Sequence, residues 1–266
     1  MSGGARSEAA PPRGFLATAG DMVAFLTRAL RDLPQVRHYA GETIRQAAII
    51  GTTSVLVVVA ISFLAGGSCG LESSALARSF GTAPIAGGFS AWCALREVVP
   101  FVFGYVLAAK VGCGMVAELG AMRVAEEVDA IEAMGVRAMA YLVGTRLVGA
   151  AVVVPFAYLL AIASADGAAY LMSVLRFGDV SPGTWGTYFF AFQDLWDLAY
   201  SMVKGLTIAG FVIVVALYFG YGVRGGPVDV GAATARSMAV SIVGVTLISM
   251  AGTLVFWNAN PRIPIG

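Results

Sequence analysis

Charged side chains are scarce in this chain of 266 residues. Asp, Glu, Lys and Arg together make up 12% of it, against about 25% in typical soluble domains. Hydrophobic residues reach 58%, and the mean hydropathy is +0.81. These values exclude an ordinary soluble domain and predict an integral membrane protein. The net charge of +1 provides no broad basic surface, so no nucleic-acid partner is expected.

Histidine and cysteine are also rare. The single histidine, His38, lies outside the apolar runs, which argues against a histidine-based metal site or nucleophile. The three cysteines, Cys69, Cys93 and Cys113, lack the paired spacing of a metal site, and each lies in or beside an apolar segment. We expect them to be small packing residues rather than members of a disulfide or a metal site.

No phosphate-binding loop of the form G-x-x-x-x-G-K-[ST] occurs in the chain. There is also no Ser/His or paired-Asp arrangement that would support a membrane protease or acyltransferase. The chain is therefore predicted not to be an enzyme, to have no catalytic residues and to bind no metal or cofactor. Any ATP hydrolysis would come from another subunit.

Long apolar runs dominate what is present. Five of them approach the ~20 residues that a membrane-spanning helix needs, at about 45–67, 89–117, 140–165, 197–223 and 235–260. Barrel strands would be short and alternating, so the pattern predicts an all-α polytopic bundle within one domain, residues 35–266. Residues 1–13 are rich in Gly, Ala, Ser and Pro and are predicted to be disordered.

The segment 14–34 has a different pattern from the five runs. Its apolar residues recur at intervals of three and four and its charged residues occupy other positions, which predicts an amphipathic helix lying in the membrane interface. The apolar set is Leu16, Ala19, Val23, Leu26, Leu30 and Leu33, and the charged set is Asp21, Arg28, Arg31 and Asp32.

The distribution of basic residues predicts the orientation. With the N-terminus in the cytoplasm and the C-terminus outside, twelve basic residues lie on cytoplasmic segments and three lie outside, as the positive-inside rule requires. The twelve are Arg6, Arg13, Arg28, Arg31, Arg37, Arg45, Lys110, Arg123, Arg137, Arg146, Arg224 and Arg236, and the three are Arg78, Arg176 and Arg262.

An acidic connector, residues 117–135, joins the second and third spans on the cytoplasmic side. Val124, Val128, Ile131 and Met134 recur at helical spacing, which predicts one amphipathic helix along the membrane surface. Its charged residues would remain available to a soluble partner. They are Glu118, Arg123, Glu126, Glu127, Asp129 and Glu132.

Arg96 and Glu97 lie well inside the second span, and Lys204 lies well inside the fourth. Charges at such depth normally face the interior of the bundle or a wet cavity and pair with one another. Neighbouring residues point about 100° apart on a helix, so Arg96 and Glu97 need partners elsewhere, and Lys204 and Asp197 are candidates. Two interpretations stay open: a polar pocket for the head group of an amphiphile, or a structural ion pair between helices.

Several of these segments together resemble the MlaE/YrbE permeases, the membrane subunits of ABC-type lipid transporters that work with MCE-domain proteins. The resemblance is carried by Leu95-Arg96-Glu97-Val98-Val99-Pro100, by the run from Gly112 to Arg123, and by the Glu-Glu-Val-Asp-Ala-Ile-Glu-Ala-Met-Gly that ends at Gly135. The segment 218–228 and the tail 258–262 are similar to the actinobacterial YrbE branch, in which a B-type subunit pairs with an A-type paralogue.

The resemblance implies a place in a larger complex in the cytoplasmic (inner) membrane. It implies a second permease subunit, two cytoplasmic ATPases that bind ATP and Mg²⁺ and dock on residues 118–135, and MCE proteins on the outer face. The substrate would be a lipid, either a fatty acid or a phospholipid. The polar part of its pocket would contain Arg96, Glu97 and Lys204, and from helical position we expect Leu56, Val59, Phe63 and Leu64 in the apolar part.

Two other functions remain as alternatives. A secondary transporter would favour an inverted repeat with broken helices, and five spans do not provide one. A membrane scaffold that only anchors an outer-face complex would need no ATPase partner. Transport driven by ATP would distinguish the proposed function from both.

Overall fold

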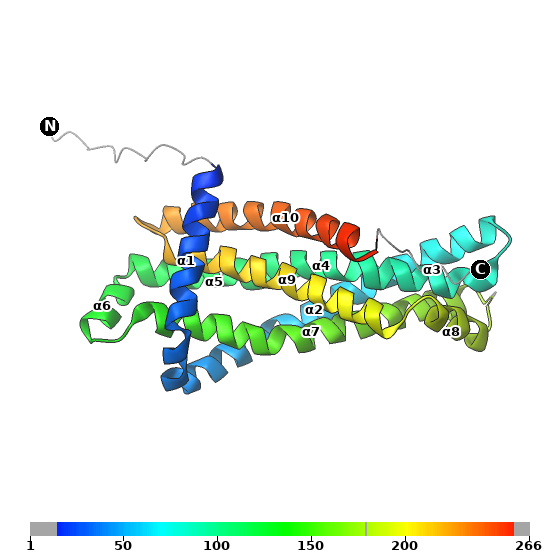
Figure 1. Ribbon diagram of the computed structural model, residues 1–266, viewed down its shortest axis with the longest axis horizontal. Coiled ribbons are helices and arrows are strands. Elements are labelled where there is room, and N and C mark those ends of the chain that lie inside the picture. The colour runs from blue at the N-terminus through cyan, green and yellow to red at the C-terminus, as the bar shows by residue number, and fades with distance from the viewer. Residues whose placement is uncertain (1–14, 179, 258–266) are drawn as a thin grey trace.

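The computed structural model describes residues 15–178 and 180–257. Within these ranges the regular structure is helical, and no strand occurs. The predicted disorder of residues 1–13 and the tail motif at 258–262 lie outside the described residues. The longer helices run side by side as an elongated bundle, and α1 crosses one end of it (Figure 1).

The helical segments form an almost unbroken series. They are α1 (Phe15–Val36), η1 (Arg37–Tyr39), α2 (Ala40–Ser79), η2 (Ala83–Ile85), α3 (Ala86–Trp92), η3 (Cys93–Val98), α4 (Val99–Val106), η4 (Leu107–Gly112), α5 (Cys113–Val124), α6 (Glu127–Ala133), η5 (Met139–Gly144), α7 (Thr145–Tyr170), η6 (Leu171–Arg176), α8 (Pro182–Ala191), α9 (Leu195–Tyr221) and α10 (Pro227–Trp257). The segments η3 and η4 are single π-helical turns inside the second long helix, whereas η5 and η6 are such turns at the two ends of the third.

Within the described residues, five helices are long and apolar enough to span a membrane, which confirms the predicted fold class. The first candidate runs from Ala17 to Ser79 and includes α1, η1 and α2. The others are 83–124, 139–176, 195–221 and 227–257. The first three contain the first three predicted runs, the fourth ends at Tyr221, two residues before the end of its run, and the last run extends beyond the described residues. The helices are longer than the apolar runs because backbone hydrogen bonding can continue through the polar residues that flank each run.

Small residues bring α2 and α7 close together. A Cβ atom on Gly66 would overlap the backbone of Ala165, and one on Gly70 would overlap the backbone of Ala169. Both pairs are four residues apart, so they form small-residue stripes that let two helix backbones approach closely, as is common in membranes. Residue numbers rise together along the two helices, so they are parallel, as first and third spans should be.

Helix α1 is anchored to the bundle by a different apolar face from the predicted one. Phe25, Ala29 and Val36 are buried, and the Phe25 ring packs 5.8 Å from the ring of Tyr218 in α9. Val23 and Leu30 belong to the predicted set, but they are 63% and 47% exposed. The helix thus has one apolar stripe against the bundle and another facing outward. Its position in the membrane interface stays a prediction.

The prediction for the cysteines was wrong for two of the three. Cys69 of α2 and Cys93 of η3 form a disulfide, with their Cα atoms 5.8 Å apart. Cys113 is free. The two bonded cysteines are 24 residues apart, and the turn between α2 and α3 brings them together. Sequence spacing alone did not reveal that turn.

Replacement of Gly66 by Ala should lower the stability of the protein by about 2 kcal/mol, because the added methyl group overpacks the contact with Ala165. The control is Gly167→Ala in α7, where the new Cβ meets no atom within 4 Å. Alanine is the better helix former, so the control should be neutral or slightly stabilising. Melting temperatures of the purified variants in detergent would test this, and equal values would contradict the packing assignment.

Candidate functional site

Arg96 and Glu97 lie on η3, the π-helical turn in the second span. Such turns occur frequently at functional sites because the extra residue locally re-aims the side chains. As expected from their positions, the two side chains point to different neighbours. Arg96 contacts the beginning of α9, whereas Glu97 contacts α10.

Asp197 is the partner of Arg96. The Nη2 atom of Arg96 lies 3.2 Å from Oδ1 of Asp197, and the indole N–H of Trp257 donates to the same oxygen at 2.6 Å. The guanidinium centre also lies 4.5 Å from the ring centroid of Trp92. An arginine held over an aromatic face gains cation–π stabilisation. The buried charge of Arg96 is thus matched by Asp197.

The beginning of α9 holds Asp197 in place. The side chain of Asp194 accepts a hydrogen bond from the Asp197 N–H at 3.0 Å, and the Asp197 carboxylate accepts one from the Asp194 N–H at 3.4 Å. This reciprocal arrangement is a capping box, which satisfies two backbone donors at the start of a helix. The Asp197 carboxylate therefore takes part in capping the beginning of α9 and also balances the charge of Arg96.

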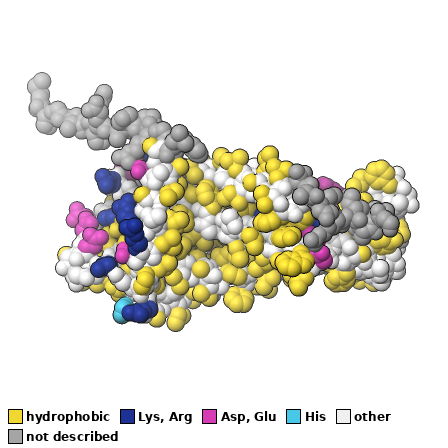
Figure 2. Space-filling model, in the orientation of Figure 1, with side chains coloured by type: hydrophobic (Ala, Val, Ile, Leu, Met, Phe, Trp, Pro, Cys, Tyr) yellow, Lys and Arg dark blue, Asp and Glu magenta, His cyan; other side chains and the backbone are white. Residues whose placement is uncertain are grey.

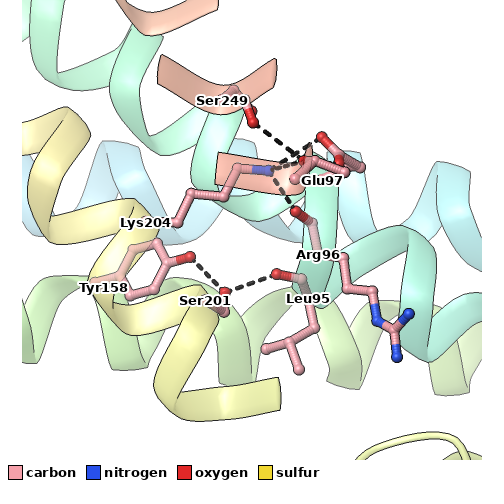
Figure 3. A network of polar contacts seen from close by, with 8 residues as sticks. Leu95, Arg96, Glu97, Tyr158, Ser201, Lys204 and Ser249 are labelled. Carbon is pink, nitrogen blue, oxygen red and sulfur yellow. Dashed lines mark hydrogen bonds and ion pairs between the residues drawn. The ribbon is translucent and has the colours of Figure 1, made fainter. Parts of the chain in front are cut away.

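Lys204 joins three spans (Figure 3). Its Nζ donates to the carbonyl of Arg96 at 2.7 Å, to Oγ1 of Thr253 at 2.7 Å and to Oε2 of Glu97 at 3.2 Å. The hydroxyl of Thr253 donates to the other oxygen of Glu97. The Lys204 side chain is fully buried, whereas that of Glu97 is 48% exposed. One ammonium group of α9 thereby connects η3 to α10.

A second chain of hydrogen bonds continues this cluster toward α7. Ser201 donates to the carbonyl of Leu95 at 2.6 Å, and its hydroxyl lies 2.8 Å from the hydroxyl of Tyr158. Sequence reasoning missed Ser201, Tyr158, Thr253 and Trp257. The spacing of Asp197, Ser201 and Lys204 places them on one face of α9, and this periodicity was an available signal.

A shallow groove lies between the second and fifth spans next to this cluster, with a volume of about 320 Å³. Apolar and hydroxyl side chains make up most of its wall, and Glu97 supplies the charge. The lining residues are Glu97, Phe101, Thr246, Ser249, Met250, Thr253 and Leu254. Arg96 and Lys204 are not among them, because both are turned into the bundle and covered.

The predicted apolar lining lies on α2 and does not contribute to this groove. Leu56 and Leu64 are 76% and 69% exposed, and Phe63 is exposed as well. Val59 is half-buried, and its carbonyl accepts a hydrogen bond from Ser164 of α7. The structure thus places these residues on the outer surface of α2, and their role in a pocket stays a prediction.

The acidic connector is not the single helix that was predicted. Helix α5 ends at Val124, Glu126 adopts a left-handed conformation with φ of 58°, and α6 begins at Glu127. The turn lets Val128 become fully buried, while Met134, predicted on the same apolar face, is 73% exposed. The regular spacing of the apolar residues in the sequence could not reveal that the chain turns at Glu126.

Arg123 holds this turn against the end of α9. Its Nε donates to the carbonyl of Tyr221 at 3.1 Å, and its guanidinium lies 4.2 Å from the ring centroid of Tyr221. Nη1 of Arg123 lies 3.3 Å from Oδ1 of Asp129 in α6. Arg123 and Asp129 therefore have a structural role inside the connector.

Glu118 also has an intramolecular partner. One of its carboxylate oxygens lies 2.8 Å from Nη2 of Arg146 in α7, and Arg146 is almost completely buried. Glu126 and Glu127 lie at the turn, are exposed and have no ion pair among the described residues. Charged side chains gather at this end of the molecule, whereas hydrophobic ones cover its middle (Figure 2).

The comparisons with known proteins identify the family. A model of the permease MlaE family matches residues 43–255. The chain belongs to the MlaE permease family. This membership confirms the resemblance found in the sequence, and it confirms that the chain is a permease rather than the ATPase of an ABC transporter.

Similar proteins occur in distant organisms. A probable ABC transporter permease protein of Rickettsia bellii is 27% identical over 82% of this chain and 84% of its own length. The intermembrane phospholipid transport system permease protein MlaE of Haemophilus influenzae is 24% identical over 84% of this chain and 86% of its own length. The chloroplastic protein TRIGALACTOSYLDIACYLGLYCEROL 1 of Arabidopsis thaliana is 26% identical over 60% of this chain and 45% of its own length.

Removing one or the other partner of the ion pair between Glu118 and Arg146 should destabilise the protein by different amounts. Glu118→Ala leaves a buried guanidinium without its counter-ion and should cost about 3 kcal/mol of stability. Arg146→Met leaves a half-exposed carboxylate that water can solvate, and it should cost about 1 kcal/mol. Thermal unfolding of both variants would test the difference. Equal losses, or a larger loss for Arg146→Met, would show that this pair is not the buried joint that we describe.

Proposed function

We propose that this chain is the transmembrane permease subunit of an ATP-driven lipid transporter. The observation that carries the proposal is the groove beside Glu97, which combines an apolar wall with a polar end on the side of a membrane-spanning bundle. A fatty acid or a phospholipid has the same two parts. Membership of the MlaE permease family supports the proposal, as does the similarity to the Haemophilus influenzae relative, a permease of an intermembrane phospholipid transport system.

The energy would come from separate cytoplasmic ATPases that bind ATP and Mg²⁺. The turn between α5 and α6 offers them a docking surface, because Glu126 and Glu127 are exposed there and Met134 adds an apolar contact. Charge complementarity at such a surface would affect the association rate and the orientation of the docked ATPases more than their affinity. Glu118, Arg123, Asp129 and Glu132 would support the surface.

The contacts of the connector provide a route from the ATPases to the groove. Arg123 fastens the turn to the cytoplasmic end of α9, and Glu118 fastens α5 to Arg146 of α7. Farther along α9, Lys204 holds η3 and α10 together beside the groove. A displacement of α6 would therefore move α9, and α9 would change the spacing between η3 and α10.

Further partners follow from the family resemblance. A second permease subunit, an A-type YrbE paralogue, would pair with this chain, and MCE-domain proteins would bind its outer face. The disulfide supports the proposed orientation, because Cys93 follows α3 at the end of the bundle opposite α6 (Figure 1). Disulfides persist in oxidising compartments outside the cytoplasm, so α6 would face the cytoplasm of a cell with this protein in its inner membrane.

The alternatives differ in their energy source. A secondary transporter would move lipid in response to an ion gradient, and a scaffold would not move lipid at all. Transport assayed in vesicles that contain the permease, its ATPases and their outer-face proteins would distinguish the three. Dependence on ATP hydrolysis supports the proposed function, whereas lipid transport without ATP would overturn it.

The double variant Glu126→Lys/Glu127→Lys should weaken association with the ATPases at least tenfold and abolish ATP-dependent transport. The reason is that both carboxylates lie at the exposed turn and take part in no ion pair in the described structure. Co-purification of the ATPases with the tagged permease would measure the first effect, and lipid transport in vesicles would measure the second.

The matched control is Glu72→Lys, an exposed acidic residue in the outer half of α2. It should leave both association and transport unchanged. The melting temperature of the double variant should stay close to that of the wild type, because neither side chain takes part in a described ion pair or hydrogen bond. A double variant that still binds the ATPases and transports lipid would refute the docking assignment.

A further inference from the structure

The two cations beside the groove are buried and each has an acidic partner within the bundle. A lysine ammonium has three donors, and Lys204 directs them to the Arg96 carbonyl, to Thr253 and to Glu97. Its side chain is fully buried. Arg96 is paired with Asp197 and lies between the rings of Trp92 and Trp257. Neither residue lines the groove.

The polar groups that do line the groove are acceptors and hydroxyls. The Glu97 carboxylate is half-exposed and accepts from Lys204 through one oxygen and from Thr253 through the other. A carboxylate has about four acceptor positions, so Glu97 can accept further hydrogen bonds from a ligand. Ser249 also lines the groove, and its buried hydroxyl oxygen has no hydrogen-bond partner among the described residues.

An anionic head group would therefore meet the exposed carboxylate of Glu97, whereas the ammonium of Lys204 that balances it is buried and already donates to three acceptors. A buried polar or charged group without a partner is strongly disfavoured in an apolar environment. A head group that donates hydrogen bonds, such as an ammonium or a hydroxyl, would instead find the free acceptor positions of Glu97 and the hydroxyl of Ser249. The charged residue that a head group can reach in the groove is therefore Glu97 rather than either buried cation.

We propose that the groove selects lipids whose head group donates hydrogen bonds and carries no net negative charge, with Glu97 as the accepting residue. This inference rests on the proposed function, because it concerns the substrate of the same groove. It narrows the substrate class to zwitterionic or uncharged lipids. An ionised fatty acid would be excluded, whereas one with a protonated carboxyl group would be accepted as a donor.

The test compares two phospholipids with the same acyl chains. The permease, co-expressed with its partner subunits, is purified from an equimolar mixture of dioleoyl phosphatidylethanolamine and dioleoyl phosphatidylglycerol. Mass spectrometry then gives the ratio of the two lipids bound to the complex. The wild type should retain phosphatidylethanolamine over phosphatidylglycerol by about tenfold relative to the mixture.

The variant Glu97→Gln removes the negative charge and leaves Lys204 without a counter-ion beside the groove. Its preference should disappear or reverse toward phosphatidylglycerol, a change of about tenfold or more. The control Glu72→Gln changes the net charge equally at an exposed site that does not line the groove, so it should keep the wild-type ratio. Ser249→Ala breaks no described hydrogen bond of the hydroxyl and should fold normally, with about threefold less phosphatidylethanolamine bound.

The outcomes separate this inference from the proposed function. Bound lipid with a ratio near one in the wild type, or an unchanged preference in Glu97→Gln, overturns the charge selection and leaves the proposed function intact. If Glu97→Gln does not fold, an unchanged ratio in Ser249→Ala overturns the selection. If no lipid is bound by the wild type, both the inference and the lipid groove of the proposed function fail.

Discussion

The structure depends on one buried ammonium group. Lys204 lies in the middle of an apolar bundle, where an unpaired charge would be costly, and it is tolerated because the second and fifth spans supply its three acceptors. Those acceptors come from a carbonyl, a hydroxyl and a carboxylate that must be held at hydrogen-bond distance together. The requirement that all three hydrogen-bond donors of Lys204 have acceptors therefore determines how η3, α9 and α10 are arranged. The groove beside Glu97 is a consequence of that arrangement.

The same principle operates at the opposite end of the bundle. Arg146 is buried in α7 and takes its counter-ion from Glu118 of α5, while Arg123 joins the connector to Tyr221 at the end of α9. Each of these charges has a partner on a different helix, so each acts as a joint between helices. Helix α9 carries a joint at both ends, which makes it the structural link between the acidic connector and the groove in the mechanism that we propose.

Much of the fold could be predicted, because a span is specified locally by its hydropathy and length. The site was predicted in part. Arg96, Glu97 and Lys204 stood out as charges in apolar runs, and the structure brings them together, but it buries Arg96 and Lys204 and leaves Glu97 open to the groove. The prediction of a single amphipathic helix at 117–135 was wrong because Glu126 adopts a left-handed conformation. This residue turns the chain without changing the spacing of the apolar residues in the sequence. The disulfide of Cys69 and Cys93 was missed because it depends on how two helices meet.

The sequence by itself determined that this is a five-span helical membrane protein, that it contains no phosphate-binding loop, and that a few charges must be paired inside it. Hydropathy and motif spacing are local properties, and they can be read along the chain. Only the tertiary structure decided which partner each charge has and which polar atoms stay open to a ligand. Those properties depend on distances of a few ångströms between residues as far apart as Glu97 and Thr253, and such distances exist only after the helices have packed.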